Sequence, residues 1–401
     1  MNHARVLLSL AGVLCAAAPS VARAQSGDTL ASRLLSPGVQ YRHILDPRGP
    51  WTMHVVRIDL RSAGVDVRNA RAHDSLRSRE KPTDMVRRAT SAGAQVLVAV
   101  NADFFELKSG ENENNQVVAG EWWKGVKVTE SPYDTYDNPH IQFAMDAAGR
   151  PQMDRYILDA TAWARGVATP IINVNANPSG NPEGTALFTS RFGATTPRDT
   201  TRQTAEAPLA AAGRRGDTLL FVRRGAASNA SGTPIPAGGA VLSAYGAGLR
   251  TKEVLAMADG DTVRILLATL PRMARGGVPT MLIGGWPRIL RNGSSVAADA
   301  PTVEGTISRN AEARHPRTAI GFSRDSSALL ILTVDGRSEK SVGMTLAELA
   351  TVMRTLGAWD AMNLDGGGST TMVIGGAVVN KPSDPTGERD VGNALLVVKK
   401  R

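Results

Sequence analysis

The sequence predicts an α+β fold, in which a strand-rich mixed sheet carries a few helices and the C-terminal part contains a βαβ unit. Short apolar, β-branched runs bounded by turn residues recur along the chain, as strands do. Only a few stretches, such as 83–92 and 345–356, have helical periodicity and a helix-start signal. An apolar run at 329–334, the helix at 345–356 and a short run at 361–364 then follow in βαβ order.

The first 24 residues have the pattern of an export signal. Arg5 supplies positive charge, Val6 to Ala18 form a short apolar core, and Ala22-Arg23-Ala24 offers a cleavage site before Gln25. A permanent membrane anchor needs about 20 apolar residues, so no stable anchor is expected. The sequence therefore predicts an exported protein, periplasmic or extracellular, whose mature part is residues 25–401.

Cysteine usage narrows the chemistry further. The only cysteine, Cys15, lies inside the signal, so the mature chain is expected to contain none. This excludes disulfides, cysteine nucleophiles and thiolate metal sites from the mature protein.

The length and charge of the chain exclude other classes. With 401 residues and 42% hydrophobic residues, the chain can build a sizeable core in one large domain or two. The net charge is +9, and it becomes +7 when Arg5 and Arg23 leave with the signal. The arginines are dispersed and no basic, aromatic-interleaved patch occurs, which argues against nucleic acid as a partner. The charge instead suits anionic, phosphate-bearing substrates or envelope polymers.

The remaining elements follow in chain order. An antiparallel start over 38–71 precedes the helix 83–92, and the buried strand 96–100 ends in Asn101-Ala102-Asp103. A polar loop, 106–115, leads into a hairpin. The middle region, about 170–250, is loop-rich and is interpreted as a possible insertion or subdomain. Further strands are predicted at 141–145, 219–222, 240–243, 263–267, 318–322 and 391–398, and a strand followed by a Gly-Gly turn at 281–290.

The most unusual stretch is 363–371, because it places a carboxylate, three glycines and three hydroxyls directly after an apolar strand. Glycines at a strand end let the main chain approach a ligand, and they can turn successive N–H groups toward an anion. The stretch is therefore a candidate anion cradle, made by Gly366, Gly367, Gly368, Ser369 and Thr370, with Asp365 at its mouth. The alternative is a tight turn between two strands.

Other polar residues are expected around the same cleft. Asp335 ends the strand 329–334, and ligands of βαβ units bind beyond the carboxyl ends of the parallel strands, so Asp335 and Asp365 should share one rim. Arg317 opens the strand that pairs with 329–334; a structural ion pair between Arg317 and Asp335 is the alternative to a functional role. Asn101 and Asp103 repeat the N-x-D ending of Asn363 and Asp365, although Asn and Asp also simply favour turns.

Four blocks carry a resemblance to a known family. Residues 317–321, 334–337, 343–350 and 363–370, in that order and spacing, resemble the phosphodiester glycosidase family, which includes the lysosomal uncovering enzyme and many bacterial relatives. Weaker similarities at 101–105, 283–291 and 389–398 extend the resemblance over most of residues 25–401. Ala102 stands where many relatives have glycine.

The resemblance implies a secreted glycosidase that cleaves a sugar-1-phosphodiester, releasing the sugar and leaving a phosphomonoester. Phosphate is a good leaving group, so such an enzyme needs anion stabilisation more than a strong general acid. With the residues above, it implies phosphate binding by Arg317, aided by the cradle and by Arg389, and sugar or phosphate orientation by Asn101 and Asn363. It also implies Asp365 as nucleophile or water-activating base, with Asp335 or Asp103 as its partner or as a ligand of sugar hydroxyls.

Two other classes remain as alternatives. One is a non-catalytic envelope protein that binds a phosphorylated or exported polysaccharide with the same cleft, and the other is a metal-dependent phosphodiesterase. No lysine follows the glycines as in a P-loop, and no G-x-S-x-G elbow occurs. The histidines are scattered singly, so no histidine-rich metal site and no cofactor is expected, although carboxylates and main-chain oxygens could hold Ca²⁺ or Mg²⁺.

Overall fold

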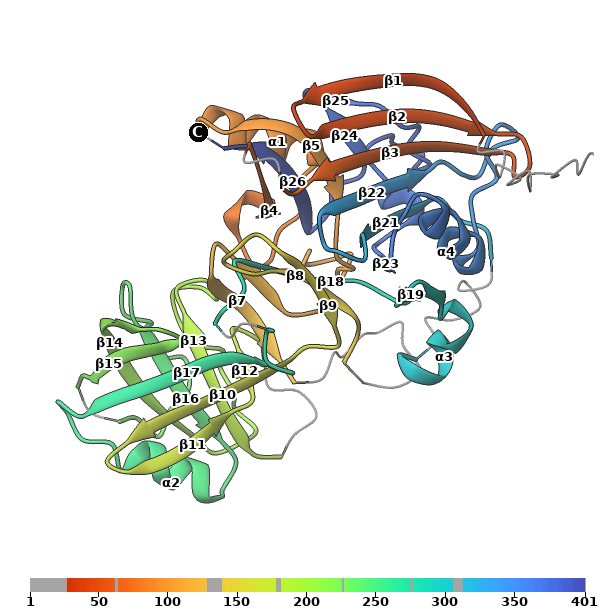
Figure 1. Cartoon of the computed structure of the whole chain (residues 1–401). Coiled ribbons are helices and arrows are strands. Elements are labelled where there is room, and N and C mark those ends of the chain that lie inside the picture. Colours follow the sequence, from red (N-terminus) through yellow and green to blue (C-terminus); the bar gives the residue numbers. More distant parts are fainter. Residues whose placement is uncertain are drawn as a thin grey trace, which may run out of the picture.

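The computed structural model of the chain describes residues 27–61, 64–127, 139–177, 182–225, 227–274, 277–305 and 313–400. The predicted export signal, residues 1–24, lies outside the described residues. Three sheets and a few helices make up this part of the molecule, as expected for a mostly-β α+β fold (Figure 1). None of the helices in these ranges is long and apolar enough to cross a membrane.

An eight-stranded sheet and a five-stranded sheet form the part of the molecule that carries the predicted site. The eight strands lie in the order β1 (Asp28–Ser36), β2 (Val39–Asp46), β3 (Trp51–Asp59), β22 (Ala328–Val334), β21 (Arg317–Phe322), β23 (Asp360–Asn363), β19 (Arg288–Arg291) and β20 (Ser294–Ser295). The five strands lie in the order β25 (Ala377–Val378), β24 (Met372–Ile374), β5 (Gln95–Asn101), β26 (Asn393–Lys399) and β4 (Val65–Arg71).

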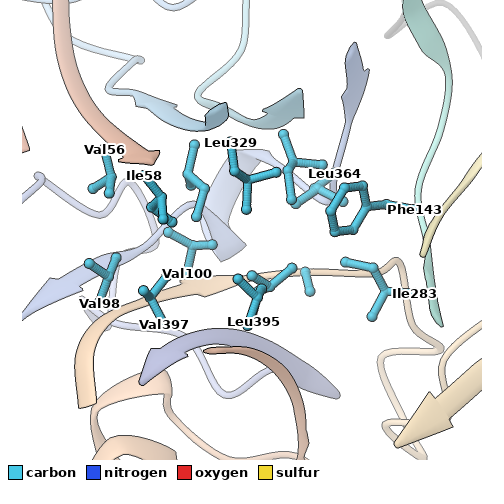
Figure 2. Packing of buried hydrophobic residues seen from close by; sticks show 14 of the residues in the cluster. Val56, Ile58, Val98, Val100, Phe143, Ile283, Leu329, Leu364, Leu395 and Val397 are labelled. Carbon is cyan, nitrogen blue, oxygen red and sulfur yellow. The ribbon is translucent and has the colours of Figure 1, made fainter. Parts of the chain in front are cut away.

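These two sheets pack face to face over one apolar core. Figure 2 shows valine, isoleucine and leucine side chains of β3 and β22 above those of β5 and β26, with Phe143 and Ile283 closing the core at one side. Alternate residues of each strand point into this core, because successive side chains of a strand face opposite sides of the sheet. Burying apolar surface of this kind contributes about 25 cal/mol for each Å² removed from water.

Two helices cover the outer faces of the two sheets. α4 (Leu346–Thr355) packs Leu349 and Met353 on the eight-stranded sheet, and α1 (Pro82–Ser91) packs Met85 and Val86 on the five-stranded sheet. The layers are therefore helix, sheet, sheet and helix. The predicted capping box of α4 is confirmed, since Thr345 accepts a hydrogen bond from the Glu348 amide and Glu348 accepts one from the Thr345 amide.

The remaining strands form a thirteen-stranded antiparallel-rich sheet that lies below the other two in Figure 1. The order is β11 (Val167–Ile171), β10 (Ile157–Ala164), β17 (Thr262–Leu270), β15 (Thr218–Arg223), β14 (Thr204–Arg215), β16 (Ala240–Tyr245), β13 (Gly184–Thr189), β12 (Asn173–Val174), β7 (Glu121–Val126), β6 (Gln116–Val118), β18 (Met281–Gly284), β8 (Gln142–Met145) and β9 (Pro151–Asp154). α2 (Leu249–Leu255) contacts β14 and β16, whereas α3 (Ala300–Val303) follows β20.

Residues 170–250 lie within this third sheet. Within this region, which was expected to be loop-rich, residues Thr204–Arg215 form the twelve-residue strand β14. Its small side chains alternate into the core of the sheet, where Ala205, Ala207 and Leu209 are fully buried. That residues 170–250 were inserted as a unit stays a prediction.

The predicted βαβ unit is not confirmed in its usual form. β22, α4 and β23 follow one another, and β22 and β23 both run antiparallel to β21, so they are parallel to each other. They are not neighbours, however, because β21 lies between them in the sheet. β21 and β22 are close in the chain and pair as a local hairpin. β23 then pairs with the free edge of β21.

Candidate active site

The predicted site lies at the edge of the eight-stranded sheet where β22 and β23 end and β21 begins. Asp335 follows β22, Asp365 follows β23, and Arg317 is the first residue of β21 between them. Gly336 and Gly366 both lie directly against Pro316, and the Gly367 amide donates to the Pro316 carbonyl at 2.9 Å. The two aspartates thus flank the same short segment, which is the arrangement expected from the sequence.

Asp365 is held in place from the second sheet. Its amide donates to the Ala102 carbonyl at 2.9 Å, and its own carbonyl accepts from the Asn101 side chain at 2.6 Å. The Asn101 Oδ1 atom in turn accepts from Thr318 Oγ1 at 2.7 Å and from the Thr371 amide at 3.1 Å. Asn101 is fully buried, so a direct contact between it and a ligand would require these bonds to break.

The carboxyl group of Asp365 is the chemically most unusual group of the rim. Burial raises the pKa of Asp365 to about 6, despite hydrogen bonds from Ser369 and the Gly366 amide and the charge of Arg389, which lower it. The nearby charge of Asp103 also raises this pKa. Asp365 and the two glycines after it are partly exposed, so a ligand can reach them. A carboxyl with such a pKa takes up and releases a proton close to neutral pH.

Asp103 lies behind this site without access to solvent. It is 1% exposed, and its carboxylate accepts from Asn114 Nδ2 at 2.8 Å and Gln116 Nε2 at 2.6 Å. Burial raises the pKa of Asp103 to about 6 as well, against the lowering effects of the Asn114 hydrogen bond and of Lys124 and other nearby positive groups. The geometry favours an indirect role for Asp103, through its charge on Asp365, over contact with substrate.

Asp335 is anchored to the loop that follows β25. Its Oδ1 atom accepts from the Lys381 amide at 3.0 Å, and its Oδ2 atom lies 3.9 Å from His54 Nε2. The other His54 nitrogen, Nδ1, lies 2.8 Å from the Tyr41 hydroxyl. Asp335 therefore holds the start of the segment 381–389, which brings Ser383 and Arg389 over the glycine turn. The alternative ion pair between Arg317 and Asp335 is not present, since Arg317 has no carboxylate within 4 Å in the described ranges.

The glycine turn differs from the expected cradle. The amides of Gly366, Gly367, Ser369 and Thr370 donate to acceptors inside the protein, so they do not point together at an open anion site. The glycines are needed for another reason. A Cβ atom on Gly368 would clash with the Arg389 guanidinium, and one on Gly367, whose φ is 59°, would lie 3.1 Å from Arg337 Nη2. The two glycines therefore let arginines approach the main chain, Arg337 at Gly367 and Arg389 at Gly368.

Arg389 and Arg317 differ in the groups that their guanidinium groups bind. Arg389 is bonded to Asp384, with Nε at 2.7 Å and Nη2 at 2.6 Å, and its Nη1 lies 3.5 Å from Ser369 Oγ. Arg317 is 6% exposed and donates to the main-chain carbonyls of Met344 and Ala313. Burial lowers the pKa of Arg317 to about 10. A buried guanidinium without a carboxylate is a candidate anion ligand, because an anion would offset the cost of its burial.

Two further predicted residues are buried beside the turn. Asn363 donates from Nδ2 to the Trp286 carbonyl at 2.6 Å, and its Oδ1 atom has no partner within the described part of the chain. Thr370 is 1% exposed, and its hydroxyl likewise lacks a partner there. Sequence reasoning gave no role to Arg337, although it stands in the block 334–337. Its left-handed backbone and its proximity to the turn are visible only in the structure.

Of the predicted site residues, Arg389 lines an adjoining cleft, whereas Asp365 and Arg317 do not line it. The cleft, of about 470 Å³, is lined by this arginine with Asp384 and by groups from the segment before α1, among them Arg79 and Lys81. The described residues contain no group of three or more His, Cys, Asp or Glu side chains that could hold a metal ion. The site therefore combines two carboxyls of raised pKa, Asp365 and Asp103, with several arginines and an adjoining cleft.

Comparison with known proteins agrees with this arrangement. Residues 210–398, which include Arg317, Asp335, Asp365 and Arg389, match the model of the phosphodiester glycosidase family. The family supports a glycosidase-type function. An N-acetylglucosamine-1-phosphodiester alpha-N-acetylglucosaminidase of Mus musculus is 33% identical over 110 residues, which are 26% of this chain and 21% of the mouse protein. The match thus spans about a fifth of that relative's length.

Two solved structures share the fold. A hypothetical protein from Synechocystis has a TM-score of 0.72 and 20% identity, covering 94% of this chain and 65% of that one. A protein of Burkholderia pseudomallei described as exported has a TM-score of 0.64 and 24% identity, covering 87% and 74% of the two chains. These likenesses show that the fold extends over most of the chain, including the part before residue 210.

Proposed function

We propose that the protein is an exported glycosidase that hydrolyses a sugar-1-phosphodiester to the free sugar and a phosphomonoester. The observation that carries the proposal is Asp365, a partly exposed residue whose carboxyl has a pKa raised by burial to about 6, beside a glycine turn contacted by two arginines. A carboxylate and a cationic anion site side by side are what attack at an anomeric carbon with a phosphate leaving group requires. The family match supports the same chemistry.

In the proposed reaction, the bond between the anomeric carbon and the phosphate oxygen breaks, and its electron pair stays on the phosphate. The oxygen of water ends on the anomeric carbon, and Asp365 acts either as the base that takes the proton of that water or as a nucleophile that is later displaced by it. Because phosphate leaves readily, the arginines replace the strong general acid of ordinary glycosidases. Burial keeps the pKa of Asp365 high, and the nearby charge of Asp103 adds to this effect.

Arg317 is proposed to contribute to phosphate binding. Arg389, which is bonded to Asp384, is proposed to orient the Ser369 hydroxyl at the side of the turn that adjoins the cleft. Asp335 is proposed to position the segment that carries Arg389, through its bond to the Lys381 amide. The substrate class proposed is a glycosyl phosphate or a phosphorylated, exported polysaccharide of the cell envelope. Export is supported by the pattern of residues 1–24 and by the related protein described as exported.

The test is hydrolysis of a chromogenic sugar-1-phosphodiester in ¹⁸O-labelled water, followed by mass spectrometry of both products. The proposal expects label in the sugar and none in the phosphate. Label in the phosphate, with activity that EDTA abolishes, would instead establish a metal-dependent phosphodiesterase. Binding of a phosphorylated polysaccharide without turnover of any diester would establish the non-catalytic alternative.

A further inference from the structure

Arg337 lies over the glycine turn in a conformation that is unusual for an arginine. It follows β22 in the block 334–337 and has a φ of 60°, in the left-handed region that non-glycine residues seldom adopt. Its Nη1 atom donates to Ser383 Oγ at 3.3 Å, and Ser383 Oγ donates to the Gly367 carbonyl at 3.2 Å. The guanidinium is thereby placed against Gly367, two residues from Asp365 along the chain.

The charge of Arg337 has no carboxylate counterpart among the described residues. Within the described ranges no carboxylate lies within 4 Å of its guanidinium, whereas Arg389 on the other side of the turn is bonded to Asp384. Arg317 also has no carboxylate partner among the described residues. Burial, together with the positive charges of Arg317 and Arg337, lowers the pKa of His315. His315 Nε2 is buried and unpartnered in this part of the structure. The side of the turn that carries Arg337 thus holds uncompensated positive charge.

The proposed reaction creates negative charge on the group that leaves. A phosphodiester carries one negative charge, and the phosphomonoester product gains a second, with a second pKa near 6. An arginine whose charge is already met by a carboxylate stabilises such a change less than one whose charge is free. Groups that interact more strongly with the developing charge than with the bound substrate lower the barrier.

We propose, on the basis of the proposed function, that Arg337 is the principal ligand of the departing phosphate and stabilises the charge that develops on it. Ser383 orients the guanidinium, and Gly367 allows it to approach the turn. The product-like dianion should then bind more tightly than the diester. Arg389, neutralised by Asp384, serves orientation on the opposite side.

The test separates anion binding from turnover. Binding of inorganic phosphate and of a simple alkyl phosphomonoester is measured by calorimetry at pH 5 and pH 8, for the wild type, Arg337→Ala, Arg337→Lys and the control Arg324→Ala. Arg324 is also exposed at a strand turn, with its guanidinium over the Trp359 ring, so the control removes a comparable charge elsewhere. Kinetics with the chromogenic diester and thermal melting accompany each variant.

At pH 8, where the phosphomonoester is a dianion, Arg337→Ala is expected to weaken its binding about tenfold to a hundredfold relative to the wild type. Arg337→Lys should restore part of the affinity, because it keeps the charge and loses the fork. Arg337→Ala should lower kcat more than it raises KM, and Arg324→Ala should change neither.

Three results have distinct meanings. Unchanged phosphate binding and kinetics in a folded Arg337→Ala variant, with an active wild type, would overturn this inference and leave the proposed function intact. Loss of phosphate binding in the same variant, when no diester is turned over by the wild type, would support the anion site while the proposed hydrolase failed. A wild type that binds neither phosphate nor the phosphomonoester would overturn the inference.

Discussion

Replacement of Asp365 by Asn should abolish turnover and stabilise the protein at the same time. The folded environment raises the pKa of this carboxyl from 3.8 to about 6, which means that it disfavours the ionised form. At about 1.4 kcal/mol for each pH unit, keeping the group ionised above pH 6 costs the fold up to about 3 kcal/mol. Asn has nearly the same shape, retains an acceptor for the Gly366 amide, and carries no charge.

The sign of the effect fixes its pH dependence. A carboxyl with a raised pKa binds its proton more tightly in the folded state, so stability falls as pH rises from about 4 to about 6 and the loss is complete above pH 6. Asp365→Asn should therefore raise the free energy of unfolding by about 1 to 3 kcal/mol at pH 8. Below about pH 4 the carboxyl is protonated in both states, and the difference from wild type should vanish.

Urea unfolding at pH 8 and pH 4, followed by circular dichroism, measures both values, and hydrolysis of the chromogenic diester measures activity. The control is Asp325→Asn, because Asp325 is exposed and hydrogen bonds from Ser327 and Ser323 lower its pKa. That variant should be fully active and no more stable than the wild type. A change in the free energy of unfolding of the same size at pH 8 and pH 4 would refute the electrostatic reasoning. An active, folded Asp365→Asn variant would remove Asp365 from the mechanism.

The remaining predictions concern the same loop and its supports. The acid limb of kcat/KM should rise with pH through an apparent pKa near 6, since Asp365 must be ionised to act; a flat profile from pH 5 to pH 7 would contradict this. Gly368→Ala should leave the melting temperature nearly unchanged but lower kcat/KM about tenfold or more, because the new Cβ displaces Arg389. Asn101→Ala should cost about 2 to 4 kcal/mol in urea unfolding, because three buried side-chain hydrogen bonds are lost; a cost below 1 kcal/mol would show that they are dispensable. Thr345→Ala should cost about 1 kcal/mol by removing the cap of α4, with unchanged activity in the diester assay.

Local patterns predicted the parts of the fold that depend on neighbouring residues. The cap of α4 was visible in the sequence because the Thr345–Glu348 bonds join residues three apart. The β21–β22 hairpin was visible because two apolar runs flank a short turn. The spatial order of the strands was not visible in the same way. β23 pairs with β21 and not with β22, to which it runs parallel, and this pairing joins segments about 40 residues apart in the chain.

The site shows the same division. Asp365, Asp335 and Asp103 were recognised as polar residues at strand ends, and the structure gathers them around Pro316 and Ala102. Their environments could not be predicted, since the bonds from Asn114 and Gln116 to Asp103 join residues that the fold brings together.

By itself, the sequence determined several of the strands and helices, the residue types at their ends, and the family that the chain resembles, but it did not reveal the strand β14. These properties follow from side-chain chemistry and periodicity, and both are written in the order of the residues. Only the tertiary structure decided that most amides of the glycine turn donate to acceptors inside the protein. It also decided that Gly367 and Gly368 leave room for Arg337 and Arg389 to approach the main chain. The tertiary structure further decided that Arg389 has a carboxylate partner and that the pKa values of Asp365 and Asp103 are raised to about 6. Such properties depend on burial and on distances between residues far apart in the chain, because electrostatic free energies are set by three-dimensional surroundings.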